Sequence, residues 1–348
     1  DQDLLDLAAF LANVSGDFPA DGSILLNERY LTPEDLEATP TSELRRSYVS
    51  SLDALRGVTG SMRADGKFEM APVVQAVEGL FEQSMTQSSA SLLLSTVKSH
   101  DEYTYYHSVN ACILALAIGR MIGIEREHLI PIGVGAVLHD IGKTAVPTAT
   151  LNYPGRLDEE QWKEITVHPQ EGALAILAAG GPGHEISATV AFEHHARFDG
   201  AGYPKISRQK RPHVYSRAVA VADTYDAITT RRSYRRAETP NHALNALLMG
   251  AGSGYDPDLV RTFIDMMGIY PPGSVLEHDG GVAVVVSRTS EPGGPLDTLL
   301  VRDPQGNDID PEPFSLHPDS VRGQLLAQDS GIDPAALLES VDQELLSS

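Results

Sequence analysis

The residues of this sequence with the clearest capacity for chemistry are histidines and aspartates that stand within or beside apolar stretches. The strongest candidates are His107, His139, Asp140, His168, His194, His195 and Asp223. Imidazole nitrogens and carboxylate oxygens together suit first-row cations such as iron, manganese and zinc. The chain has one cysteine, which argues against a structural zinc site of the cysteine type. The set therefore predicts a catalytic metal site with open coordination positions.

Each of these residues also has a purely structural interpretation. A lone histidine on an apolar helix, such as His107 or His168, is usually a hydrogen-bonded core residue, and Asp223 could cap a helix or pair with a cation. The pair His139-Asp140, however, directly follows the apolar residues 134–138. Burying two ionisable groups without partners is costly, and ligation of a metal would satisfy them. The joint pattern therefore favours metal binding.

The charge of the chain limits the classes of partner. With 26 Lys+Arg and 48 Asp+Glu the net charge is −22, which argues against binding to a nucleic-acid polymer, because phosphate neutralisation needs clustered cations. Residues 205–236 are an exception, since their basic side chains are opposed only by Asp223 and Asp226. This segment could bind a small anion or could form a solvated helix face.

The sequence also bears on location. One cysteine cannot form an internal disulfide, no signal-peptide pattern is present, and no apolar stretch approaches the roughly 20 residues needed to span a bilayer. We therefore expect a cytoplasmic protein with no membrane span. The sequence starts at Asp1 and not at Met, so we expect a trimmed chain that upstream domains could precede.

The elements that must position the candidate residues are mainly helical. The 348 residues suffice for two or three domains. Residues 1–90 are predicted to form a helical N-terminal domain with a sensory or dimerising role, because apolar residues such as Val73, Val77 and Leu80 recur at helical spacing. Residues 91–270 alternate helical segments with short polar connections and are predicted to form the catalytic domain.

After residue 270 the pattern changes from helices to strands. Residues 282–286 and 299–301 are short apolar runs rich in valine and leucine and bounded by Gly, Pro, Asn or Asp, which predicts a small β extension over residues 271–320. Residues 321–348 are predicted to form a C-terminal helix or tail, with Asp333 as N-cap and Pro334 at the first helical position. The expected fold is therefore mainly α, with a small β appendage.

Four motifs follow one another in the helical part: HDIGK at 139–143, HPQEG at 168–172, HHARFDGAGYP at 194–204 and ADTYDAITT at 222–230. Together they resemble the HD-GYP subgroup of the HD superfamily of metal-dependent phosphohydrolases, over roughly residues 91–267. The DGAGYP loop, with Asp199, Gly200, Gly202, Tyr203 and Pro204, is far more specific than a His-Asp pair. The resemblance implies an HD-domain helical bundle that binds two or three metal ions, usually iron or manganese, and hydrolyses cyclic di-GMP.

The resemblance also implies a ligand set. The first metal would be held by His107, His139, Asp140 and Asp223. The second metal would share Asp140 as a bridge and would be held by His168 and His194, with His195 completing this environment or serving a third ion. Two cations bridged by a carboxylate can share a hydroxide that attacks phosphorus in line.

Basic and aromatic residues near the motifs are candidates for substrate contacts. Lys143 and Arg197 would neutralise phosphate oxygens, with Arg235 as a weaker candidate, although Lys143 and Arg197 could instead pair with nearby surface acids. Trp162 and Tyr153 could stack on a guanine base or simply pack against the protein.

The glycines of the DGAGYP loop, Gly200 and Gly202, are expected to supply positive φ angles, and Tyr203-Pro204 is expected to stiffen the turn, which makes a structural role the favoured one. By the resemblance, the loop would also contact a signalling partner.

The sequence departs from the family pattern at two positions. Members that bind a third metal carry a glutamate four residues before the first histidine, where this chain has Tyr103. A phenol is a poor ligand unless it is deprotonated, so we expect two metal ions. The second departure is Ala196, where many members have glutamate, and this loss could alter the orientation of the neighbouring imidazoles.

The leading hypothesis is a metal-dependent phosphodiesterase that hydrolyses cyclic di-GMP to linear pGpG, with further cleavage to GMP less expected. One alternative is a hydrolase of another cyclic dinucleotide or of a nucleotide. Another is a catalytically weak, metal-bound cyclic di-GMP sensor that signals to a protein partner. A homodimer through the N-terminal helices is also open.

Overall fold

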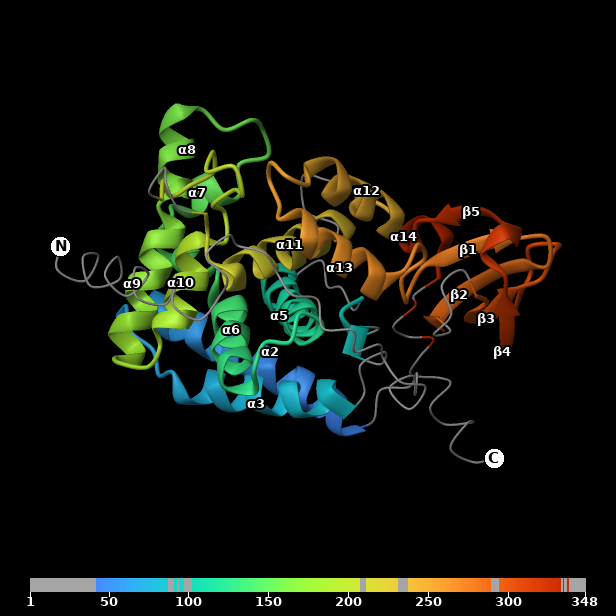
Figure 1. Ribbon diagram of the computed structural model, residues 1–348, viewed down its shortest axis with the longest axis horizontal. Helices are drawn as coiled ribbons and strands as arrows, with labels where there is room; N and C mark the ends of the chain where they lie inside the picture. Colours follow the sequence, from blue (N-terminus) through green and yellow to red (C-terminus); the bar gives the residue numbers. More distant parts are fainter. Residues whose placement is uncertain are drawn as a thin grey trace.

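The chain folds into a helical part followed by an antiparallel sheet at one end of the molecule (Figure 1). The computed structural model describes residues 42–86, 91–92, 94–96, 102–206, 211–230, 237–288 and 294–332, with 334 and 337. The predicted helices within residues 1–41, the side chain of Arg235 and most of the predicted C-terminal helix lie outside these residues. The predicted mainly α fold with a small C-terminal β part is confirmed.

The helical part contains α2 (Ser42–Asp65), α3 (Ala71–Thr86), α5 (Tyr103–Met121), α6 (Arg126–Leu138), η3 (Ile141–Ala145), α7 (Thr148–Leu151), α8 (Glu159–Thr166), α9 (His168–Gly180), α10 (Glu185–Glu193), α11 (Val214–Thr229), α12 (Pro240–Gly250) and α13 (Pro257–Met267). The C-terminal part contains β1 (Val275–His278), β2 (Gly281–Arg288), β3 (Leu296–Arg302), β4 (Asp308–Leu316), η4 (Pro318–Ser320), β5 (Val321–Leu325) and α14 (Ala327–Ser330).

Helices α5 and α6 form the centre of the helical part, and Figure 1 shows α5 surrounded by other helices. Both are apolar around most of their circumference, as expected for helices buried on several sides. Glycines in α6 allow its neighbours to approach closely, since a Cβ added at Gly135 would lie 2.7 Å from the Val190 Cβ of α10. The ends of these central helices are therefore held firmly where the candidate ligands stand.

The N-terminal helices α2 and α3 pack directly on this centre. In α3, the buried residues recur at helical spacing, as predicted, and belong to the same apolar core as α5 and α6. Tyr48 of α2 donates a buried hydrogen bond of 2.8 Å to the Asn110 side chain of α5. Arg56 of α2 forms a two-pronged ion pair with Glu102, which immediately precedes α5. Helix α2 is thus tied to the helix that carries His107.

The sheet is antiparallel throughout, with the strand order β4-β3-β2-β1-β5. Alternate residues pack on its two faces, so that Val275 and Val284 belong to one apolar cluster and Leu276 and Val285 to another. The predicted strands at 282–286 and 299–301 lie within β2 and β3.

The expected boundary of the β part at residue 320 is wrong, because residues 321–325 form β5 and pair with β1. This short, partly polar strand contains Gly323 and carries no local strand pattern. Its conformation depends on pairing with β1, which is distant in sequence.

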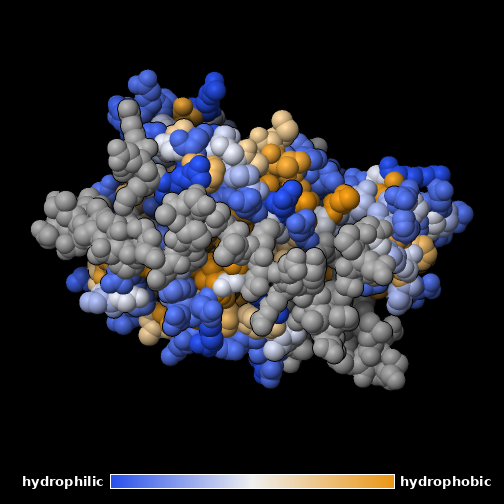
Figure 2. Space-filling model, in the orientation of Figure 1, coloured by the Kyte–Doolittle hydropathy of each residue, from blue (hydrophilic) through white to orange (hydrophobic). Residues whose placement is uncertain are grey.

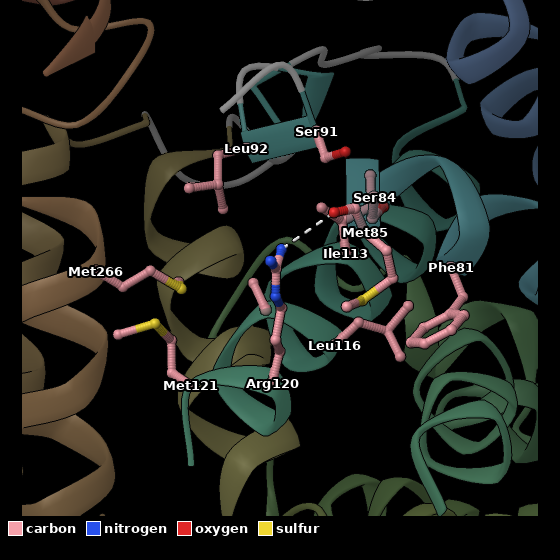
Figure 3. Close-up of a pocket in the computed structure, with 11 residues that line it drawn as sticks. Phe81, Ser84, Met85, Ser91, Leu92, Ile113, Leu116, Arg120, Met121 and Met266 are labelled. Atoms are coloured by element: carbon pink, nitrogen blue, oxygen red, sulfur yellow. Dashed lines mark hydrogen bonds between the residues drawn. The ribbon is translucent and has the colours of Figure 1, made fainter. Parts of the chain in front are cut away.

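A small apolar cavity lies between α3, α5 and α13 (Figure 3). Its lining includes Phe81, Leu116 and Met266, and the Arg120 side chain donates a hydrogen bond of 3.4 Å to the Met85 carbonyl. The volume is about 30 Å³, roughly the space of one water molecule. None of its lining residues is a candidate ligand, so this cavity is separate from the predicted metal site.

The described surface is mainly polar on the face shown in Figure 2, with a few apolar patches near its middle. Among the helices of the described residues, none combines the length and the apolar composition required to cross a membrane.

The central position of α5 predicts a large stability effect for Leu114→Ala. The Leu114 side chain is fully buried in the core, so its truncation should lower the free energy of unfolding by about 2–5 kcal/mol. The matched control is Leu248→Ala on α12, because Leu248 is 56% exposed and its truncation should change stability by less than about 0.5 kcal/mol. Equilibrium urea unfolding measures both, and equal losses in the two variants would contradict the packing described.

Candidate metal centre

Three histidines stand at helix termini with their rings held by the backbone. His139 follows α6, His194 follows α10, and His168 begins α9 just after α8. The Nδ1 atom of each ring lies 2.7 Å from the carbonyl oxygen three residues earlier, which belongs to Ala136, Ala191 and Ile165, respectively. Carbonyls in the last turn of a helix lack helical partners, and a carbonyl can only accept. Each Nδ1 therefore carries a proton, and each Nε2 is turned toward the cluster.

Asp140 lies between these imidazoles. Its Oδ1 atom is 3.4 Å from His168 Nε2 and 3.9 Å from His194 Nε2, and its Oδ2 atom is 3.4 Å from His139 Nε2. The carboxylate thus turns one oxygen toward the histidines of α9 and α10 and the other toward the histidine of α6. The Oδ1 atom is buried and accepts no hydrogen bond from the described residues.

The predicted ligands gather into two overlapping groups that share Asp140. One group contains Asp140, His168, His194 and His195, the other contains His107, His139 and Asp140, and the ligand atoms within each group lie within 4.8 Å of one another. Asp223 of α11 adjoins the second group, because its Oδ1 atom is 3.0 Å from His107 Nε2 and 3.9 Å from His139 Nε2. The structure therefore brings all seven predicted residues together, six of them buried and His195 half-buried.

This donor set fits divalent cations. The Nε2 atoms of His168 and His194 face each other at 3.2 Å, although both rings hold their proton on the opposite nitrogen. Neither atom can donate to the other, and Asp140 Oδ1 beside them also lacks a donor. A cation satisfies all three acceptors at once, and imidazole with carboxylate is a donor set suited to first-row metals.

The protonation states agree with a ligand role. Burial lowers the pKa of His168 to about 4 and that of His195 to about 3, and it holds the pKa of His194 well below its usual range. These imidazoles are therefore neutral near pH 7, the form that binds metals. Burial alone would raise the pKa of Asp140, but Lys143 and His139 hold it well below its usual range.

His107 is oriented by a residue that the sequence analysis did not assign to the site. The Oδ2 atom of Asp226 lies 2.7 Å from His107 Nδ1, and Asp226 is fully buried. Burial lowers the pKa of His107, but the hydrogen bonds to Asp223 and Asp226 raise it to about 9. Asp226 follows Asp223 by three residues on α11, and that spacing, which places both carboxylates on one helix face, is the sequence signal for this role.

Lys143 lies at the edge of the cluster. Its Nζ atom is 2.5 Å from Asp140 Oδ2, and its side chain is one-third exposed. It belongs to η3, which packs on the start of α9 so closely that a Cβ added at Gly142 would lie 2.0 Å from the His168 carbonyl oxygen. Glycine at position 142 therefore permits the contact that places Asp140 and Lys143 beside His168.

The DGAGYP loop folds back onto the paired histidines. The Tyr203 backbone N–H donates a hydrogen bond of 3.2 Å to the His195 carbonyl, and the centroids of the two rings are 4.8 Å apart. Gly200 has a positive φ of 78°, as predicted, but Gly202 does not, so that expectation is wrong. Glycine is required at 202 for a different reason, because a Cβ there would lie 2.1 Å from the His195 carbonyl oxygen.

Other candidates lie around this cluster or beyond the described residues. Arg197 forms a two-pronged ion pair with Asp199 at 2.9 and 3.2 Å, and its side chain is nearly half exposed. The Tyr203-Pro204 peptide bond is cis. Tyr103 stacks on His107 with ring centroids 5.3 Å apart. Ala196 is buried within the loop, and Arg235 lies outside the described residues.

Residues 89–259 match the family model described as HD domain. This part of the chain is an HD domain. It resembles the HD-GYP subgroup through the DGAGYP loop. Its four motifs lie, in chain order, at the end of α6, at the start of α9, after α10 and within α11.

Curated proteins are similar to part of this chain. The chain is 35% identical over 213 residues to cyclic di-GMP phosphodiesterase PA4108 of Pseudomonas aeruginosa, covering 60% of this chain and 50% of that protein. It is 30% identical over 175 residues to the 3'3'-cGAMP-specific phosphodiesterase 3 of Vibrio cholerae, covering 50% of this chain and 38% of that protein. The chain thus spans at most about half the length of these curated relatives.

A solved structure is similar in fold to about two thirds of this chain. Bd1817, an HDG"Y"P protein from Bdellovibrio bacteriovorus, superimposes with a TM-score of 0.54 at 17% identity. The match covers 67% of this chain and 75% of that one. At this identity the likeness concerns the fold.

Asp226→Asn tests the orientation of His107. Loss of the carboxylate should weaken metal binding by about 10- to 100-fold, because the partner of a ligating imidazole fixes its orientation and basicity. The matched control is Asp319→Asn in η4, which alters an exposed pair between Asp319 and His317, the residue before η4. Metal content after dialysis against a metal buffer measures the effect, and equal metal retention in both variants would show that Asp226 has no such role.

Proposed function

We propose that this chain is a metal-dependent phosphodiesterase that hydrolyses cyclic di-GMP to linear pGpG. The observation that carries the proposal is the placement of Asp140, whose two oxygens face two groups of imidazoles. A carboxylate in this position suits a bridge between two cations, and a pair of bridged cations suits hydrolysis of a phosphodiester. The names of the relatives supply the substrate class.

The residues that would hold the cations follow from the two groups. His107, His139 and Asp223 would hold one cation, and His168, His194 and His195 would hold the other, with Asp140 shared. Iron or manganese is favoured by the resemblance to the HD-GYP subgroup, and a set of imidazoles and carboxylates suits such first-row ions. Two such cations supply Lewis acidity and an activated water near neutral pH. Tyr103 at the position of a family glutamate favours two cations over three and therefore pGpG over GMP as the product.

The basic side chains near the cluster differ in how readily they could contact a bound phosphodiester. Lys143 lies within the cluster, and its part-exposed ammonium can contact a non-bridging phosphate oxygen while it stays near Asp140. Arg197 is held by Asp199 at the surface, so its contact with substrate would require sharing or leaving this ion pair. Lys143 is therefore the stronger candidate for stabilising the charge that builds up on phosphate, and Arg235 remains a further candidate.

The alternative activities share the same metal centre. The 3'3'-cGAMP-specific relative supports hydrolysis of another cyclic dinucleotide as a second candidate. A cyclic di-GMP sensor with weak catalysis is the third. A cytoplasmic location, a homodimer and a signalling partner at the DGAGYP loop remain proposals. If a partner or a second copy regulates the chain, residues 42–86, which pack on α5, would transmit the signal to His107.

Asp140→Asn and Lys143→Ala separate metal binding from chemistry. Asp140→Asn should lose at least one metal ion and turnover together, because the bridging charge disappears. Lys143→Ala should retain its metal and lose about a hundredfold in kcat, the scale expected for removal of one charge-stabilising group. Lys67→Ala, which removes an exposed cation after α2, is the matched control and should match the unmodified protein.

The measurements are elemental analysis of anaerobically purified protein and chromatography of cyclic di-GMP and 3'3'-cGAMP after incubation with manganese or ferrous iron. Chelator-treated protein should form no product, and restoring the metal should restore it. Full metal occupancy in Asp140→Asn would contradict the bridging assignment. Bound metal with bound but uncleaved dinucleotide would favour the sensor.

A further inference from the structure

The only tryptophan of the chain stands on a helix that contributes nothing to the core. Trp162 lies on α8 and is 51% exposed, and none of the eight residues of α8 is buried. Figure 1 shows α8 at the edge of the helical part, away from its centre. A large aromatic side chain normally contributes to stability by burial, so packing does not account for the position of this indole.

The Tyr203 ring lies between the exposed Trp162 indole and the clustered histidines. The Trp162 ring meets the Tyr203 ring at a centroid distance of 5.7 Å and an interplanar angle of 76°. Tyr203 in turn lies 4.8 Å from the His195 ring and 6.2 Å from the His168 ring, measured between centroids. The nearly perpendicular rings of Trp162 and Tyr203 form a corner that adjoins the clustered imidazoles.

Helix α8 is held in place although it is exposed. Asp158 and Gln161 form a reciprocal capping box at its start, with hydrogen bonds of 2.9 and 3.1 Å. Thr150 of α7 donates a hydrogen bond to Glu164 and ties the two helices together. The indole is therefore presented by an ordered element, which lowers the entropic cost of binding a ligand against it.

The charge around Trp162 restricts what the corner can bind. Helix α8 carries Glu159, Glu160 and Glu164 against one cation, Lys163, which pairs with Glu160 at 3.0 Å. The net negative charge opposes an anionic group, such as a phosphate or an acidic membrane surface. Positive charge instead lies at the cluster, where Lys143 stands. A ligand that fits both places has a neutral planar part over Trp162 and a phosphodiester at the cluster, which describes a cyclic dinucleotide.

We propose that Trp162, with Tyr203 as the second wall, forms a base-stacking subsite for one purine of the dinucleotide bound at the metal centre. The inference rests on the proposed function and adds to it the element that holds the base. Stacking uses the face of the ring, which every base offers, so the subsite accepts guanine and adenine alike. It sets the affinity for cyclic purine dinucleotides and leaves discrimination between them to other residues.

Trp162→Ala tests the subsite by steady-state kinetics. We expect KM for cyclic di-GMP to rise about tenfold or more, and KM for 3'3'-cGAMP to rise to a similar degree, because both ligands lose the ring on which one base stacks. The kcat value should change less than threefold, and Trp162→Phe should restore most of the KM. The inhibition constant of inorganic phosphate, which binds the metal centre without a base, should stay the same.

Metal content and melting temperature of each variant check that folding and the centre are intact, and Phe314→Ala on β4 serves as a control for loss of an exposed aromatic ring elsewhere. A KM for both dinucleotides that stays within twofold in Trp162→Ala would overturn the subsite. So would a rise in the inhibition constant of phosphate equal to the rise in KM, because that would place the defect at the metal centre.

The unmodified protein offers an independent readout, since Trp162 is its only indole. Titration of manganese-loaded protein with the slowly hydrolysed phosphorothioate analogue of cyclic di-GMP should quench the fluorescence with a saturable curve. Equilibrium dialysis of the same ligand defines saturation separately. Binding without any fluorescence change overturns the subsite but leaves the proposed function standing, whereas absence of both binding and hydrolysis of any dinucleotide overturns both.

Discussion

The arrangement of the metal centre depends on one kind of hydrogen bond, which joins the Nδ1–H group of a histidine to a backbone carbonyl at a helix terminus. The bond occurs at His139, His168 and His194 with the same length of 2.7 Å. It satisfies a carbonyl that the helix leaves without a partner and fixes the proton on the nitrogen remote from the cluster. At His168 and His194, which burial keeps neutral, the Nε2 lone pairs then face each other without a proton between them, and a cation satisfies both.

This constraint explains why the surrounding fold is so tightly packed. The three carbonyls belong to different segments, so the rings converge only if α6, α9 and α10 end or begin at fixed places relative to one another. The close contacts at Gly135, Gly142 and Gly202 hold these segments together, because each admits a neighbour where a Cβ would not fit. Asp226 orients the His107 ring in the same way, with a carboxylate in place of a backbone carbonyl as the acceptor.

The sequence revealed the ligands because their chemistry contrasts with their surroundings. An ionisable pair after an apolar run, as at His139-Asp140, requires a partner, and the spacing of the DGAGYP loop is distinctive. The sequence analysis did not assign Asp226 to the site, because this residue lies in the basic segment 205–236 and was interpreted as opposing its cations. The strand β5 was missed because its pairing with β1 is a long-range interaction, and Gly202 was assigned a positive φ because sequence alone does not separate backbone freedom from close approach.

The strongly acidic composition is compatible with an anionic substrate because of how charge is divided within the site. Asp140, Asp223 and Asp226 are buried together. The ammonium of Lys143 opposes the first of them, and His107, whose pKa the other two raise to about 9, opposes those two. This excess of buried negative charge favours cations and disfavours a phosphodiester until cations are bound. Under the proposed function, affinity for the dinucleotide phosphate would therefore depend on prior metal binding, whereas the proposed stacking on Trp162 would not. The two contributions can be separated by changing metal and base independently.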